Sequence, residues 1–139
     1  MRIVITGAQG QLGTDLRQVL QGHQLTLLDL PTFDLTHQDC GRVIVEAAPE
    51  VVIHAGAHTD VDGAERHPAL ALAVNAEGTE RVARAAALVG ARLIYISTDY
   101  VFDGRGTRPY VETDPNNPVS AYGESKQAGE QRALACCEN

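Results

Sequence analysis

Two short segments, far apart in the chain, carry residue types that could together do redox chemistry. The first is a glycine-rich turn with Gly7, Gly10 and Gly13, which follows an apolar run and precedes a helical pattern. Such a turn can hold the pyrophosphate of a dinucleotide. The second is Tyr122 with Lys126 four residues later, a spacing that places both side chains on one face of a helix. A phenol beside an ammonium can deliver a proton to a reacting carbonyl oxygen.

Each glycine of the turn has its own expected role in cofactor binding. Gly7 permits a tight turn, Gly10 lets the backbone approach the pyrophosphate, and Gly13 allows the helix to pack closely on the strand. The backbone N–H groups near Gln11 and Leu12 are expected to face the phosphates, where the positive end of the helix dipole favours an anion.

Small and acidic residues at two further predicted strand ends agree with a nicotinamide dinucleotide. Asp29 ends the second strand, where a carboxylate can bind the 2′-hydroxyl of the adenine ribose. The same carboxylate would repel a 2′-phosphate, so the sequence favours NADH over NADPH and leaves dual use open. Ala55, Gly56 and Ala57 follow the central strand, and their small side chains let a cofactor approach the backbone.

Polar residues end the next strand. Thr98 is placed to bind the reacting carbonyl oxygen beside the Tyr122 hydroxyl, a positioning and electrostatic role. The alternative for Ser97 and Thr98 is simple capping of the strand end. For Asp99, contact with a substrate and orientation of a loop are equally compatible with the sequence.

Composition narrows the class of protein. The net charge of −7 argues against a nucleic-acid or anionic membrane surface, and no apolar run is long enough for a membrane helix. The three cysteines do not resemble a disulfide framework, so we expect free thiols and a cytoplasmic location. His54, His58 and His67 lack a recognised ligand spacing, so packing or surface roles are favoured and no metal site is expected.

Strand-length apolar runs alternate with helical patterns, which predicts an α/β protein with a parallel sheet. Strands are predicted over 2–6, 25–29, 51–56 and 92–97, with a short extended piece near 33–35. Helices are predicted over 11–21, 38–48, 67–89 and from a cap at Asn117 and Pro118 to about residue 137. The polar stretch 103–118 is predicted to be a long functional loop.

The segment Ile96-Ser-Thr-Asp-Tyr-Val-Phe-Asp-Gly104 closely resembles the dTDP-4-dehydrorhamnose reductases, a family of extended short-chain dehydrogenases. Residues 6–13, 49–65, 74–79 and 122–126 agree with the same family. The resemblance implies a Rossmann-like, doubly wound, three-layer αβα fold. It also implies reduction of the 4-keto group of dTDP-6-deoxy-L-lyxo-4-hexulose to dTDP-L-rhamnose with NADH or NADPH.

The resemblance also implies roles for individual residues. Tyr122 would donate the proton with Lys126 as its partner, and Thr98 and Asp99 would meet the sugar substrate. Asn75 matches a residue with a supporting role in related enzymes. The residues implied along the cofactor are Gly10, Gln11, Leu12, Asp29, Asp34, Leu35, Ala57, His58 and Thr59.

The chain departs from the family in two side chains and in length. Family members often carry Asn at the position of His54 and Ala at that of Gly56; neither change removes a catalytic group. Because family members are longer, we expect residues 1–139 to form an NAD(P)-binding Rossmann domain. The last strand and the sugar-binding region would then be missing, and strand 92–97 would be an open edge. For the complete protein, a homodimer is a further expectation.

Three alternatives stay open at this point. One is a nucleotide-binding regulatory subunit that resembles the beta subunit of methionine adenosyltransferase. Another is a different NAD-dependent sugar-nucleotide epimerase or dehydratase. The third is an inactive, poorly folded remnant, an interpretation motivated by the exposed sheet edge.

Overall fold

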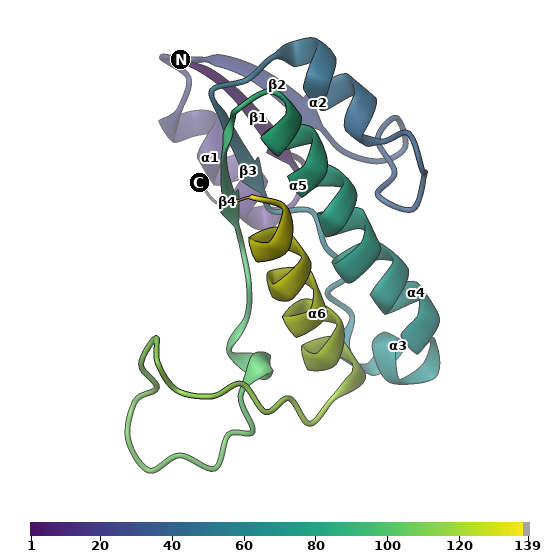
Figure 1. Cartoon of the computed structure of the whole chain (residues 1–139), viewed down its shortest axis with the longest axis vertical. Coiled ribbons are helices and arrows are strands. Elements are labelled where there is room, and N and C mark those ends of the chain that lie inside the picture. Colours follow the sequence, from purple (N-terminus) through teal and green to yellow (C-terminus); the bar gives the residue numbers. More distant parts are fainter. Residues whose placement is uncertain (138–139) are drawn as a thin grey trace.

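The computed structural model describes residues 1–137 as a four-stranded parallel sheet with helices on both faces (Figure 1). The strands lie in the order β2-β1-β3-β4. They are β1 (Arg2–Thr6), β2 (Gln24–Leu28), β3 (Val51–His54) and β4 (Arg92–Tyr95). The helices are α1 (Gln11–Val19), α2 (Gly41–Ala47), α3 (Val61–Arg66), α4 (Pro68–Leu72), η1 (Ala73–Gly78), α5 (Thr79–Leu88), η2 (Asp99–Val101) and α6 (Ala121–Cys136).

The two faces of the sheet are both apolar because the strands are buried on both sides. Ile3 and Ile5 of β1 and Ile53 of β3 form one cluster, against which Leu16 and Leu20 of the α1 side pack. Residues of the opposite parity form a second cluster with α2 and α5; its members include Val4, Val52, Ile44 and Val82. The doubly wound, three-layer α/β fold predicted from the sequence is therefore confirmed. Figure 1 shows α2, α5 and α6 on one side of the sheet and α1 on the other.

Within residues 1–137, β4 pairs only with β3, so its other side is the open edge that the sequence predicted. In the same part of the chain, no helix combines the length and apolar character needed to cross a membrane.

Two local predictions were wrong, and a third was confirmed with an added detail. The extended piece near 33–35 is not a strand, because the carboxylate of Asp34 accepts bonds from the N–H and hydroxyl of Thr36 and so stabilises a turn. The long helical stretch predicted over 67–89 is confirmed, because α4, η1 and α5 follow one another without a break; the sequence did not predict that the middle segment, η1, is a π-helix. The short helix α3 was missed; the Asp60 side chain caps it by accepting the Gly63 N–H at 2.9 Å.

The last helix begins later than predicted. Its cap is Ser120, whose hydroxyl oxygen accepts the N–H of Gly123 at 3.1 Å. Asn117 does not cap a helix, because its side chain donates to Asp103 at 3.0 Å and its backbone N–H to Val101 O at 2.9 Å. Those bonds tie down the long loop instead.

Glycines bring the ends of β1 and β3 into direct contact. Gly7 has φ of 68°, and a Cβ atom built on it would lie 2.6 Å from the backbone nitrogen of Gly56. A Cβ on Gly13 would overlap the carbonyl oxygen of Gly7. The turn therefore needs glycine at position 7 for both its backbone conformation and its space, and at position 13 for space alone.

Gly7→Ala tests this contact, with Gly90→Ala as the matched control. Gly90 has φ of 69° but open space around it, so its substitution costs only the left-handed strain, about 1 to 2 kcal/mol. Gly7→Ala adds the collision with Gly56, and we expect it to cost about 1 to 3 kcal/mol more. Urea unfolding of the three proteins measures both costs. Equal losses in the two variants would contradict the contact.

Candidate functional site

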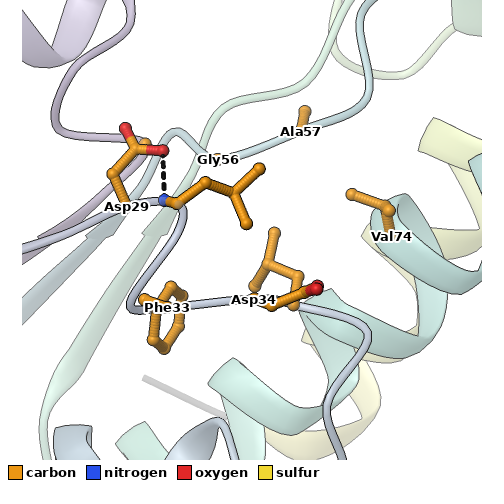
Figure 2. Close-up of a pocket in the computed structure, with 9 residues that line it drawn as sticks. Asp29, Phe33, Asp34, Gly56, Ala57 and Val74 are labelled. Atoms are coloured by element: carbon orange, nitrogen blue, oxygen red, sulfur yellow. Dashed lines mark hydrogen bonds between the residues drawn. The ribbon is translucent and has the colours of Figure 1, made fainter.

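A cleft lies at the carboxyl ends of β1, β2 and β3, where ligands of parallel sheets bind. Its volume is about 110 Å³, and Figure 2 shows several of its lining residues facing the open space. It is lined by Gly7, Asp29, Leu30, Phe33, Asp34, Leu35, Gly56, Ala57 and Val74. Six of these residues were predicted to bind the cofactor. Leu30, Phe33 and Val74 also line the cleft and were not predicted, although the apolar character of Phe33 was a usable signal.

The predicted pyrophosphate site is the start of α1. Gly10 is the N-cap and has no side chain with which to cap the helix, and the first turn holds no acidic residue. Gly10, Gln11 and Leu12 are exposed, whereas Gly13 is buried against the turn. Uncapped N–H groups at an exposed helix start leave an anion site open.

Asp29 holds the turn as well as facing the cleft. One of its carboxylate oxygens accepts the backbone N–H of Gln9 at 2.7 Å. The other accepts the backbone N–H of Leu30 at 2.8 Å, the bond that Figure 2 draws as a dashed line. A carboxylate has about four acceptor sites, so it can still receive a ribose hydroxyl. Asp29 therefore has a structural role in the turn, which the sequence did not reveal, in addition to its predicted role in cofactor binding.

The chain after β3 runs along the cleft and is fixed by Asn75 of η1. Asn75 accepts the N–H of His58 at 2.8 Å and donates to the His58 carbonyl at 3.0 Å. Ala55 is half-buried and Thr59 is exposed beside this segment. Among the described residues, Nδ1 of His58 is the one buried side-chain polar atom without a partner. An unsatisfied buried atom costs free energy, which a ligand could recover.

Thr98 caps the short helix η2. Its hydroxyl oxygen accepts the N–H of Tyr100 at 3.3 Å, and the hydroxyl donates to Asp99 at 3.3 Å. The sequence offered capping of the strand end as the alternative role; the structure shows Thr98 capping the helix that follows the strand. Both side chains still lie at the carboxyl end of β4, as predicted.

Tyr122 lies in the first turn of α6 and is 8% exposed. Its ring meets the ring of Tyr100 edge-on, with centroids 5.5 Å apart, so the helix start lies beside η2. No hydrogen bond of the described residues joins the Tyr122 hydroxyl to Thr98 or to Lys126. The structure brings the three predicted catalytic residues to one end of the sheet without linking them directly.

Lys126 is the only lysine in the chain and is almost fully buried. Its ammonium donates to the carbonyl oxygen of Ile96 at 2.6 Å and lies 4.2 Å from the centre of the Tyr95 ring. Burial lowers the pKa of Lys126 to about 8, partly offset by the carboxylate of Glu130. An ammonium has three donors, so others remain for a ligand.

Sequence reasoning missed Glu130, one turn beyond Lys126. Its carboxylate accepts the Ser97 hydroxyl and, at 2.8 Å, the side-chain amide of Asn116. Glu130 therefore ties α6 to the end of β4 and to the long loop. The i, i+4, i+8 spacing of Tyr122, Lys126 and Glu130 was the signal available.

The residues present suit a dinucleotide. The uncapped N–H groups at the start of α1 suit a phosphate, the Asp29 carboxylate suits a ribose hydroxyl, and α6 holds a buried ammonium and a buried phenol at Lys126 and Tyr122. Within residues 1–137, no three His, Cys, Asp or Glu side chains are grouped as metal ligands would be.

Comparison with known proteins points to one family. The profile of the RmlD substrate binding domain matches residues 1–139. A dTDP-4-dehydrorhamnose reductase of Mycobacterium tuberculosis (strain CDC 1551 / Oshkosh) is 48% identical over 96% of this chain and 46% of its own length. The chain thus spans about half the length of the curated relatives it matches.

Solved structures agree in fold. The crystal structure of a dTDP-4-dehydrorhamnose reductase from Clostridium acetobutylicum ATCC 824 has a TM-score of 0.96 and 42% identity, covering 99% of this chain and 50% of that one. The reductase of Bacillus anthracis str. Ames in complex with NADP has a TM-score of 0.93 and 42% identity, covering 97% and 49%.

The titration of Lys126 tests the buried site. Because there is one lysine, lysine labelled with ¹³C at Cε gives one side-chain signal, and we expect it to titrate near pH 8 in the folded protein. The folded pKa lies below the unfolded value of 10.5, so the unfolded chain binds more protons between these values. Stability should therefore rise with pH across this window, by at most about 3 kcal/mol.

Lys126→Met is the control and should lose this slope. A signal that titrates near the unfolded value would contradict a buried ammonium.

Proposed function

We propose that this chain, which belongs to the RmlD substrate binding domain family, supplies the cofactor site and catalytic residues of a nicotinamide-dependent dTDP-4-dehydrorhamnose reductase. Residues 1–139 are then the NAD(P)-binding Rossmann domain. The substrate is a dTDP-linked 4-keto-6-deoxy sugar, in agreement with the names of the relatives.

One observation carries the proposal: an uncapped glycine turn and the part of α6 that holds Tyr122 and Lys126 lie at the same end of one parallel sheet. Asn75 joins the two parts, because it bonds the backbone of His58 beside the cleft and donates to Ser125 of α6 at 2.9 Å.

In the proposed reaction, a bound reduced nicotinamide supplies a hydride to C4 of the sugar. The N–H groups at the start of α1 bind the pyrophosphate, and Asp29 binds the adenine ribose. Thr98 donates its hydroxyl to the reacting oxygen and gives up its bond to Asp99. The Tyr122 hydroxyl then protonates the alkoxide that forms, and the Lys126 ammonium stabilises the resulting phenolate.

Tyr122→Phe tests the proton transfer. We expect a loss in kcat of about 10² to 10⁴, because the hydroxyl acts as the general acid, while NADH binding stays unchanged. Oxidation of NADH with the dTDP-linked 4-keto sugar measures turnover in the protein that carries this chain. Tyr110→Phe, in the long loop, is the control and should keep full activity. Normal turnover of Tyr122→Phe would reject the mechanism.

Asp29→Asn tests the preference for NADH. The substitution removes the charge that would repel a 2′-phosphate and keeps an oxygen for one backbone N–H. We expect the ratio of NADPH to NADH affinity to rise about tenfold, which is about 1.4 kcal/mol. Fluorescence titration measures both dissociation constants. Glu46→Gln removes one negative charge as well, but at an exposed position on α2, and should leave the ratio unchanged. An unchanged ratio in Asp29→Asn would assign the carboxylate to the turn alone.

A further inference from the structure

A fully buried imidazole lies at the end of β3 between two hydroxyl groups. Nδ1 of His54 is 2.6 Å from the hydroxyl oxygen of Thr6 on β1. Nε2 is 3.0 Å from the hydroxyl oxygen of Thr79, the first residue of α5. The ring therefore connects the strand that leads into the glycine turn with the helix layer that packs on α6.

A count of protons fixes the direction of these bonds. The Thr79 hydroxyl donates its single proton to the backbone carbonyl of Asn75 at 2.7 Å. Its oxygen must then accept from Nε2 of His54, so Nε2 carries the ring proton. In a neutral imidazole Nδ1 is then an acceptor, and it receives the Thr6 hydroxyl. The Thr6 oxygen in turn accepts the backbone N–H of Gly56 at 3.2 Å.

The chain of bonds continues to the helix of the proposed proton donor. The Asn75 side chain donates to Ser125, and the Ser125 hydroxyl donates to the backbone carbonyl of Tyr122 at 2.7 Å. Thr6, His54, Asn75, Thr79 and Ser125 are all buried. One end of this polar chain is thus Gly56, which touches Gly7 in the cleft, and the other end is the first turn of α6.

We propose that His54, as the neutral imidazole protonated on Nε2, is a positioning residue that holds the cofactor cleft and the Tyr122 helix in register through Thr79, Asn75 and Ser125. The inference rests on the proposed function, which makes one end of this network the cofactor cleft and the other the helix of the proton donor. The bond directions rest on the geometry alone.

The charged and titratable groups around the ring support the neutral form. Lys126 on α6 is the cation whose charge acts on His54. The Tyr95 ring on β4 lies 5.6 Å from the His54 ring, measured between the ring centres. Burial, aided by Lys126, lowers the pKa of His54 to about 3. A second ring proton would point at the Thr6 oxygen and displace the hydroxyl proton from its bond. The order of donors should therefore persist in mild acid.

Nitrogen NMR of the protein labelled with ¹⁵N-histidine tests the bond order without any cofactor. The signals of His54, identified by their loss in His54→Asn, should show a protonated Nε2 and an unprotonated Nδ1. They should stay unchanged from about pH 8 to about pH 5, a range in which an unperturbed imidazole changes its charge. The opposite tautomer, or titration of His54 in that range, would overturn the inference.

Two substitutions at His54 then separate the contributions of the two ends of this hydrogen-bonded network. The amide of His54→Asn reaches the position of Nδ1 and keeps the Thr6 bond, whereas that of His54→Gln reaches the position of Nε2 and keeps the Thr79 bond. We expect His54→Asn to lower kcat about tenfold with little change in the NADH dissociation constant. We expect His54→Gln to weaken NADH binding about tenfold, with the smaller effect on kcat.

Equal kcat and NADH affinity in both variants and the unaltered protein would reduce His54 to a packing residue and overturn the proposal. A failure of the unaltered protein to bind NADH would instead overturn the proposed function. The tautomer measurement distinguishes the two failures, because it needs neither cofactor nor substrate.

Discussion

The direct contact between the backbones of Gly7 and Gly56 is the constraint on which the rest of the structure depends. At this point β1 leaves the sheet for the turn before α1, and β3 leaves it for the segment that carries His58. Any side chain at Gly7 would fill the space that the Gly56 nitrogen occupies. Because the contact needs no side chains, backbone forms the wall of the cleft at Gly7 and Gly56, and the N–H groups at the start of α1 stay uncapped. The phosphate chemistry proposed for the turn follows from that exposure.

The same end of the sheet is held by polar groups in an otherwise apolar core. Burying a hydroxyl, an amide and an imidazole costs free energy unless each finds partners, and each of the five buried residues from Thr6 to Ser125 has them. A satisfied network of this kind favours one arrangement of its elements, because slippage leaves unpaired groups. An apolar core would not discriminate as strongly between neighbouring positions of α6. Burial of the Lys126 ammonium adds a further free-energy cost, which its bond to the Ile96 carbonyl and its contact with the Tyr95 ring partly offset.

The sequence predicted the parts of this arrangement whose signals are local. The glycine spacing, the apolar strands and the Tyr122–Lys126 spacing each report a feature formed within a few residues. The sequence did not predict that Asp29 bonds two backbone N–H groups, because those partners meet it only when the turn closes on β2. Nor could it reveal the role of His54, whose partners Thr6 and Thr79 lie 48 and 25 residues away. The late start of α6 was missed for the same reason, since Asn117 is occupied by Asp103 across the loop.

A structure of the protein with bound NAD⁺ tests most directly that the glycine turn and α6 serve one ligand. We predict the pyrophosphate against the N–H groups of Gln11 and Leu12, with the nicotinamide ring in contact with the Tyr122 side chain. A dinucleotide whose pyrophosphate lies away from α1, or whose nicotinamide ring lies out of contact with Tyr122, would contradict a shared redox site.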